Sequence, residues 1–225
     1  MNKIENGKLS FIKEIIGCLT SPKSSFRSIL EKPSLMKATA LILVIAIVAA
    51  WASFNYTGKL PTSFFVDQRP GGIVNPEQLR QASMTINATL GLISVFGTWL
   101  ISSALIHGFS SRLGGKGTFK NMLTLAGYAS TPLLIQQVLR LADSFTASKE
   151  GILQLATGFQ ISVYPLLNTI AEAAMNVFTI FRLWSIVLLV VAIRENYKMS
   201  TVRSIVIVAT SFILIALLSV FLPLK

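Results

Sequence analysis

The sequence predicts an all-α, polytopic membrane protein with five transmembrane helices behind an N-terminal amphipathic interfacial helical segment. Hydrophobic residues make up 52% of the 225 residues and charged residues 13%, whereas a soluble domain carries about 25% charged residues. The mean hydropathy is +0.66, and mostly apolar stretches reach the roughly 20 residues that a bilayer span needs. We therefore expect a multi-pass protein of the cell membrane, with the lipid bilayer as its first partner.

The basic character of the chain indicates membrane topology rather than nucleic-acid binding. The net charge is +11, from 20 Lys and Arg against 9 Asp and Glu. These bases are spread between the apolar stretches instead of forming one soluble basic face, so we expect no nucleic-acid partner. In membrane proteins, Lys and Arg collect on the cytoplasmic side.

Residues 1–34 are expected to form a cytoplasmic amphipathic lead-in. Apolar residues recur in it at helical spacing, with lysines between them; they are Leu9, Phe11, Ile12, Ile15, Ile16 and Leu19. Ser21-Pro22 separates this helix from a second short one, which has an apolar and a basic side. Helices of this kind lie in the headgroup region, and this is the interpretation we favour. The alternative is that they pack against the cytoplasmic end of the helix bundle.

The second predicted domain is a five-span unit over 35–225, with spans at about 35–56, 84–110, 119–141, 171–193 and 202–222. Asn75-Pro76 predicts the start of the second long helix, with Asn75 as its cap and Pro76 in its first position. A helix unbroken from there to Arg112 would be roughly 55 Å long and would project beyond the ~30 Å hydrocarbon core.

One face of the second span carries small residues three or four apart, which permits close helix approach in lipid; they are Gly91, Ser94, Thr98 and Ser102. The turn at 111–118 is basic and glycine-rich. Because this turn is so short, we expect the second and third spans to form the tightest helix pair.

Pro132 stands in the middle of the third span. Proline removes a backbone donor and clashes with the carbonyl four residues earlier, so we expect a kink there. Gly127, Ser130 and Thr131 beside it help neighbouring groups to satisfy the freed backbone atoms.

The distribution of Lys and Arg predicts the orientation of the chain. Thirteen of them fall in the lead-in and in the turns after the second and fourth spans, and six fall in the other segments outside the spans. Since positive charge marks the cytoplasmic side, the N-terminus should be cytoplasmic and the C-terminus extracytoplasmic.

The stretch from His107 to Pro132 resembles the Yip family of Ypt/Rab-interacting membrane proteins. A span ends in a basic Gly-Gly turn, and Phe, Gly-Tyr-Ala and a proline follow; the matching residues are Gly114, Gly115, Phe119, Gly127, Tyr128, Ala129 and Pro132. The prokaryotic branch of the family is also similar in the lead-in sequence Ser21-Pro22-Lys23-Ser24-Ser25-Phe26 and in Leu183-Trp184 of the fourth span.

The resemblance implies a five-span domain with a cytoplasmic N-terminus. For eukaryotic relatives it also implies binding of prenylated small GTPases and support of vesicle traffic. Those relatives have a long cytosolic N-terminal region with an acidic Asp-Leu-Tyr-Gly-Pro motif, which the lead-in of this chain lacks. We therefore do not carry small-GTPase binding over to this chain.

The fourth span contains the candidate functional residues, a polar stripe of Asn168, Glu172, Asn176, Thr179 and Arg182. A charge in mid-span is costly unless it is paired or hydrated, so Arg182 should face inward. Polar groups of the third span are its expected neighbours: Ser130, Thr131, Gln136 and Gln137. One interpretation is a polar cavity that opens to the outside. The alternatives are structural hydrogen bonding and an arginine that extends toward the interface.

The sequence contains no recognisable catalytic, metal or cofactor signature. His107 is the single histidine, and we interpret it as a polar residue that bonds across helices or to headgroups. Gly114-Gly115-Lys116-Gly117 lacks the spacing of a phosphate-binding loop. We therefore expect a protein that is not an enzyme and needs no cofactor.

Three functions are compatible with these features. The first is an adaptor or scaffold of the Yip type that organises a membrane partner, a second copy of itself or the bilayer. The second is an accessory subunit of a larger membrane complex. The third is a small transporter or channel that uses the polar stripe, although paired broken helices of the kind found in transporters are not evident.

The predicted topology can be tested by cysteine labelling of intact membranes in a background without Cys18. Asp67→Cys and Lys149→Cys should react with an impermeant maleimide from outside, and Lys116→Cys should not, because the charge distribution places only the last of these on the cytoplasmic side. Labelling of Lys116→Cys from outside would contradict the topology.

Overall fold

The computed structural model describes residues 3–67, 75–150, 152 and 179–221, and the regular elements in these ranges are helices. In chain order they are α1 (Lys3–Thr20), α2 (Pro22–Glu31), α3 (Leu35–Lys59), α4 (Thr62–Asp67), α5 (Pro76–Arg112), α6 (Phe119–Ala129), α7 (Thr131–Thr146), α10 (Ile180–Tyr197) and α11 (Thr201–Phe221).

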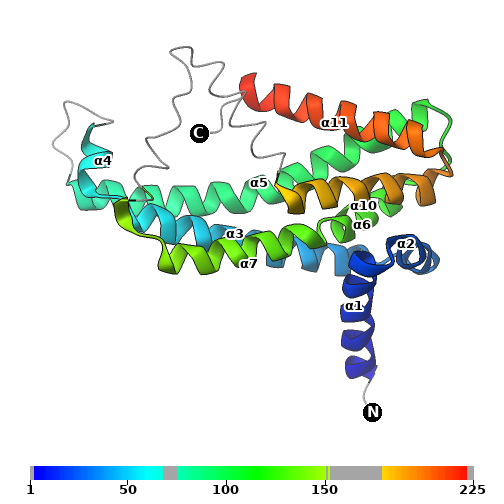
Figure 1. The fold of residues 1–225 in the computed structure, drawn as a ribbon, viewed down its shortest axis with the longest axis horizontal. Coiled ribbons are helices and arrows are strands. Elements are labelled where there is room, and N and C mark those ends of the chain that lie inside the picture. The colour runs from blue at the N-terminus through cyan, green and yellow to red at the C-terminus, as the bar shows by residue number, and fades with distance from the viewer. Residues whose placement is uncertain (1–2, 68–74, 151, 153–178, 222–225) are drawn as a thin grey trace.

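The long helices run side by side along the long axis of the molecule (Figure 1). α1 runs crosswise to this bundle, and α2 lies beside it near the end that holds the α5–α6 turn. α4 lies at the opposite end. The short N-terminal helices are therefore docked on the bundle rather than aligned with it.

Side-chain caps fix the starts of the main helices, as the sequence leads one to expect. The Asn75 side chain accepts a hydrogen bond from the Glu77 backbone N–H at 3.0 Å, and Pro76 occupies the first turn of α5. The predicted unbroken helix to Arg112 is confirmed. Thr118 caps α6 by accepting from the Asn121 N–H at 3.2 Å.

The kink predicted at Pro132 is a complete helix break. α6 ends at Ala129 and α7 begins at Thr131, so Pro132 falls in a first helical turn, where its missing N–H costs nothing. The Ser130 hydroxyl donates to the Ala126 carbonyl at 3.0 Å, and the Thr131 hydroxyl donates to the Tyr128 carbonyl at 2.6 Å. The Ala126 carbonyl also accepts from the Ser130 backbone N–H at 3.2 Å, so the hydroxyls supplement the backbone bonds at the break.

The expectation that the second and third spans pair most closely is wrong. α5 packs most extensively against α3, because alanines on α3 allow close approach along most of its length. A Cβ built on Gly91 of α5 would lie 3.7 Å from the Ala50 Cα of α3, so this part of the small-residue face does contact a helix. Because of the break in the third expected span, α6 is the part of it that packs extensively on α5.

The rest of the small-residue face has a different role from the one predicted. Ser94, Thr98 and Ser102 line an internal cavity instead of contacting a neighbouring helix directly. Their spacing predicts a common face correctly, but it does not distinguish a packed face from a cavity wall.

Two described helices, Leu35–Lys59 and Pro76–Arg112, are long and apolar enough to cross a bilayer, and Thr201–Leu217 is a shorter apolar helix. The third expected span is divided between α6 and α7. The fourth expected span, 171–193, is described only from residue 179 onward. The count of five spans stays a prediction at this point.

A close helix contact lies at Gly127 of α6 and predicts a specific sensitivity. A Cβ at Gly127 would lie 2.8 Å from the Ala38 Cβ and 3.3 Å from its carbonyl oxygen on α3. Gly127→Ala should therefore destabilise the protein by about 1–3 kcal/mol through overpacking. Unfolding of the purified protein in detergent measures the change.

Gly97→Ala on α5 is the matched control for this substitution, because a Cβ there would meet nothing within 4 Å. Both variants gain about the same helix propensity, up to ~1 kcal/mol, so their difference reports the contact with Ala38. Equal stability of the two variants would contradict the close approach of α6 and α3.

Candidate functional site

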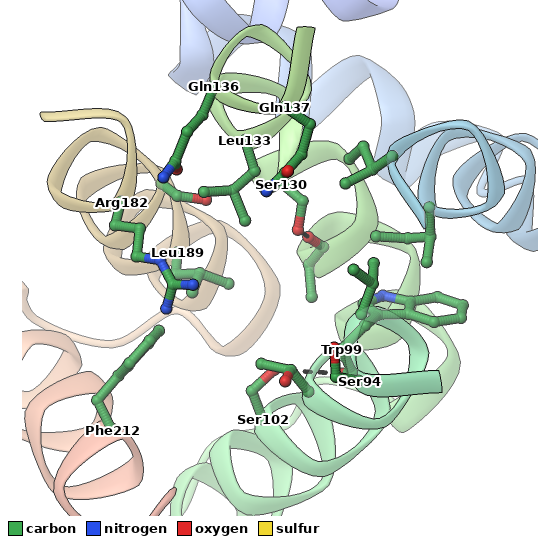
Figure 2. Close-up of a pocket in the computed structure, with 16 residues that line it drawn as sticks. Ser94, Trp99, Ser102, Ser130, Leu133, Gln136, Gln137, Arg182, Leu189 and Phe212 are labelled. Atoms are coloured by element: carbon green, nitrogen blue, oxygen red, sulfur yellow. Dashed lines mark hydrogen bonds between the residues drawn. The ribbon is translucent and has the colours of Figure 1, made fainter. Parts of the chain in front are cut away.

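A partly open cavity of about 150 Å³ lies between α3, α5, α6, α7, α10 and α11 (Figure 2). Apolar side chains such as Ile45, Leu133 and Phe212 form most of its wall. Its polar part consists of Ser94, Thr98, Ser102, Ser130, Gln136, Gln137, Arg182 and Ser185. Because six helices contribute to it, the cavity depends on the whole bundle.

Arg182 is the charged side chain that the described residues contribute to this wall. It lies in the first turn of α10, where its backbone N–H bonds to the Thr179 carbonyl at 3.0 Å. Figure 2 shows its guanidinium group directed toward the cavity, between Phe212 on one side and the glutamines of α7 on the other. Within the described part of the chain, its Nε atom is buried without a hydrogen-bond partner, and no Asp or Glu lines the cavity.

The serine hydroxyls of the wall already donate their protons to backbone carbonyls. Ser94 donates to Gly91 at 2.9 Å, and Ser185 of α10 donates to Ala129 of α6 at 2.5 Å. Ser102 and Ser130 donate to carbonyls of their own helices in the same way. Their oxygen atoms therefore remain available to the cavity as acceptors.

Two glutamines of α7 add further acceptors. The Oε1 atoms of Gln136 and Gln137 are buried without a hydrogen-bond partner. On the opposite wall, the Trp99 indole N–H donates to the Leu123 carbonyl at 3.0 Å, which ties α5 to α6 and leaves the indole with no free donor. The cavity thus combines one cationic donor with several acceptors.

The predicted polar stripe is only partly visible. Asn168, Glu172 and Asn176 lie outside the described residues. Thr179 is the residue before α10, and its hydroxyl oxygen is buried without a partner. Arg182 lines the cavity together with Ser130, Gln136 and Gln137, its expected neighbours.

Sequence reasoning missed Ser185, as well as the role of the small-residue face of α5. Ser185 follows Arg182 by three residues and so shares its helix face, a spacing that could have identified it. For α5, the signal was that Ser94, Thr98 and Ser102 carry hydroxyls, whereas a face that only packs closely could consist of Gly and Ala.

A second site lies at the end of the bundle where α1 and α2 dock. Cys18, Phe26 and Ile29 are buried there, and burial raises the pKa of the Cys18 thiol to about 12. The Arg27 Nε donates to the Glu195 carboxylate at 2.7 Å, and the Glu195 side chain is only 6% exposed. This contact joins α2 to the C-terminal turn of α10.

Glu14 makes the corresponding contact for α1. Its carboxylate accepts hydrogen bonds from Lys37 of α3 at 2.6 Å and from the Tyr128 hydroxyl of α6. Ser10 of α1 also donates to it, at 3.1 Å. Burial alone would raise the pKa of Glu14, but these hydrogen bonds outweigh it and hold the pKa below its ordinary value.

Several of the family-pattern residues shape the α5–α6 turn or form contacts between helices, and Tyr128 contacts the docked α1. Gly114 has a φ of 87°, which favours glycine, and Gly115 packs so closely on Tyr197 that a Cβ would lie 2.8 Å from its ring. Gly127 packs on α3, Tyr128 bonds to Glu14, and the Ala129 carbonyl accepts from Ser185.

Phe119 and Trp184 are the other two aromatic residues of the family pattern, and His107 lies beside Phe119. His107 Nδ1 lies 2.7 Å from the Tyr197 hydroxyl, and its ring contacts Phe119. Trp184 is partly exposed on the outer surface of α10. Among the described residues, no group of three or more His, Cys, Asp or Glu could hold a metal ion.

Comparisons with known proteins identify a family model and two relatives. A family model described as the Yip1 domain matches residues 16–222. The chain is 26% identical over 189 residues to the membrane protein YknW of Bacillus subtilis, covering 81% of this chain and 78% of that protein. It is also 26% identical over 129 residues to an uncharacterized protein of Methanocaldococcus jannaschii, covering 55% of this chain and 83% of that protein. No solved structure matches.

The docking contact of Glu14 predicts a pH dependence. Since the folded-state pKa is lowered from 4.5, the stabilisation is present above that value and is lost as the pH falls through the folded pKa. The thermal midpoint of the full chain in detergent should therefore fall more steeply with acidification than that of Glu14→Gln. Parallel curves for the two proteins would show that the Glu14 contacts do not stabilise the fold.

Proposed function

Because the chain belongs to the Yip1 domain family, we propose that this membrane protein is an adaptor or scaffold of the Yip type, without catalysis. It would hold a membrane-protein partner, or a second copy of itself, at the cytoplasmic surface of the bilayer. The single observation that supports this role best is the docked pair α1 and α2, which forms a fixed platform at one end of the bundle.

The proposal includes five spans with a cytoplasmic N-terminus. Together α6 and α7 extend over residues 119–146, roughly 40 Å of helix, which is enough for the third span despite the break. α11 offers about 30 Å for the fifth span. The N-terminus of α3 and the basic turns at 113–118 and 198–200 gather at the platform end (Figure 1), which agrees with a cytoplasmic location.

The platform has an apolar side that remains exposed on the protein. Ile12 and Ile16, one helical turn apart on α1, are 55% and 54% exposed, and Met36 at the start of α3 is 81% exposed. A helix that lies crosswise to the spans would run along the bilayer surface, where these side chains can enter the headgroup region. The two placements expected from the sequence for residues 1–34, in the headgroup region or against the helix bundle, are then compatible. One face of α1 packs on the bundle, and another faces lipid.

The polar side of α2 is the part of the platform that can receive a partner. Lys23, Arg27 and Ser28 are exposed there, and they lie along a shallow groove on the outer surface of α2. Glu195 holds Arg27 in place and thereby orders this surface. A rigid surface loses less conformational entropy on binding than a free segment, which favours partner recognition.

A small transporter or channel remains a second candidate because of the polar cavity around Arg182. Accessory-subunit function would instead use the outer surfaces of the spans. The three functions differ in which surface contacts another molecule, and this difference can be measured.

Photo-crosslinking in native membranes tests the scaffold function. A crosslinking residue in place of Ser28 should give a discrete protein adduct, whereas one in place of Val187, which is 58% exposed on α10, should give mainly lipid adducts. Undocking the platform with Glu14→Gln and Glu195→Gln should abolish the Ser28 adduct, because both substitutions remove its anchoring charges.

The native Cys18 reports whether the platform has undocked, since this thiol is fully buried in the docked state. It should react with maleimide in the doubly substituted protein but not in Arg140→Gln, a control that changes an exposed arginine elsewhere. A protein adduct only at Val187 would favour the accessory subunit over the scaffold. The absence of adducts at both positions, together with solute flux through the reconstituted protein, would favour the transporter.

A further inference from the structure

Among the residues that the structure describes, Arg182 is a partly buried cation without an acidic partner. Four described acidic side chains bind partners elsewhere: Glu14 binds Lys37, Glu77 binds Arg80, Glu195 binds Arg27, and Asp143 accepts from Tyr56. The charged group that acts on Arg182 from the neighbouring α7 is Arg140, which is also a cation. A buried charge of this kind is costly unless an ion of opposite sign or hydrogen bonds compensate it.

We propose that the cavity binds one small oxyanion that carries a proton, of the hydrogen-phosphate class. The guanidinium group of Arg182 would donate to its oxygen atoms, because the planar fork of arginine matches two oxygens of a phosphate. The P–OH group would donate to the unpartnered Oε1 atoms of Gln136 or Gln137.

The donor and acceptor pattern selects the protonated ion. The serine oxygens of the wall have already given their protons to carbonyls, and the two glutamine oxygens are acceptors. With the two amides oriented as the structure gives them, a fully deprotonated anion such as sulfate can satisfy Arg182 but has no proton for the Oε1 atoms. Inorganic phosphate keeps at least one proton at neutral pH and can satisfy both.

The size of the cavity restricts the ligand further. A volume of about 150 Å³ corresponds to roughly five water molecules at ~30 Å³ each. This accommodates an ion of five heavy atoms, but not a nucleotide or a whole lipid. Phosphodiester headgroups also lack the proton that the acceptors require, so the source is the free ion. The site is separate from the docked platform, and its occupation does not depend on the scaffold function.

Equilibrium binding of radiolabelled inorganic phosphate to the full chain in detergent tests this proposal. We expect saturable binding of one phosphate per chain, which sulfate at equal ionic strength competes only weakly. Arg182→Gln should weaken binding by about tenfold or more, since it removes a charge-assisted contact. Arg182→Lys should restore part of the affinity.

Arg112→Gln is the matched control, because Arg112 is exposed at the end of α5 and does not line the cavity. It should bind phosphate like the parent protein. If Arg182→Gln does not fold, Thr98→Phe provides the second test, because it fills the cavity while Arg182 remains. Absence of saturable binding, binding that survives both cavity variants, or equal competition by sulfate would each overturn the proposal.

Discussion

The contact between Gly127 of α6 and Ala38 of α3 sets the distance between two helices on which the other contacts at this end of the bundle depend. The two residues after Gly127 in the sequence also make contacts between helices. Tyr128 bonds to Glu14 of α1, and the Ala129 carbonyl accepts from Ser185 of α10. Three consecutive residues thus hold three different helices. A larger residue at the first position would move the other two away from their partners.

The polar groups of the protein are satisfied in two different ways. At the platform end, carboxylates and basic side chains meet in pairs close to the bundle surface, where water and headgroups can share in their solvation. In the cavity, hydroxyls are satisfied within their own helices or on the next helix, while Arg182 and the glutamines are not. The two sites are therefore suited to different tasks, assembly at the surface and ligand binding inside.

Local chemistry could be predicted from the sequence, because capping and proline effects act over a few residues. Asn75 and Pro76 begin a helix, and Pro132 interrupts one, whatever surrounds them. The use of helix faces could not be predicted in the same way. Gly91 and Thr98 lie on one face of α5, yet the first contacts α3 and the second lines the cavity, because the break in the third span lets its two halves diverge. The docking of the lead-in likewise depends on Glu195, which is remote in sequence from the helix it holds.

The break at Ser130 also makes the third span two rods instead of one. Tyr128, which binds the lead-in, belongs to the first rod, and the cavity glutamines Gln136 and Gln137 belong to the second. A tilt of the second rod would reshape the cavity without straining an interhelical bond of the first. The break therefore separates, along one expected span, the residue that binds the lead-in from the residues that line the cavity.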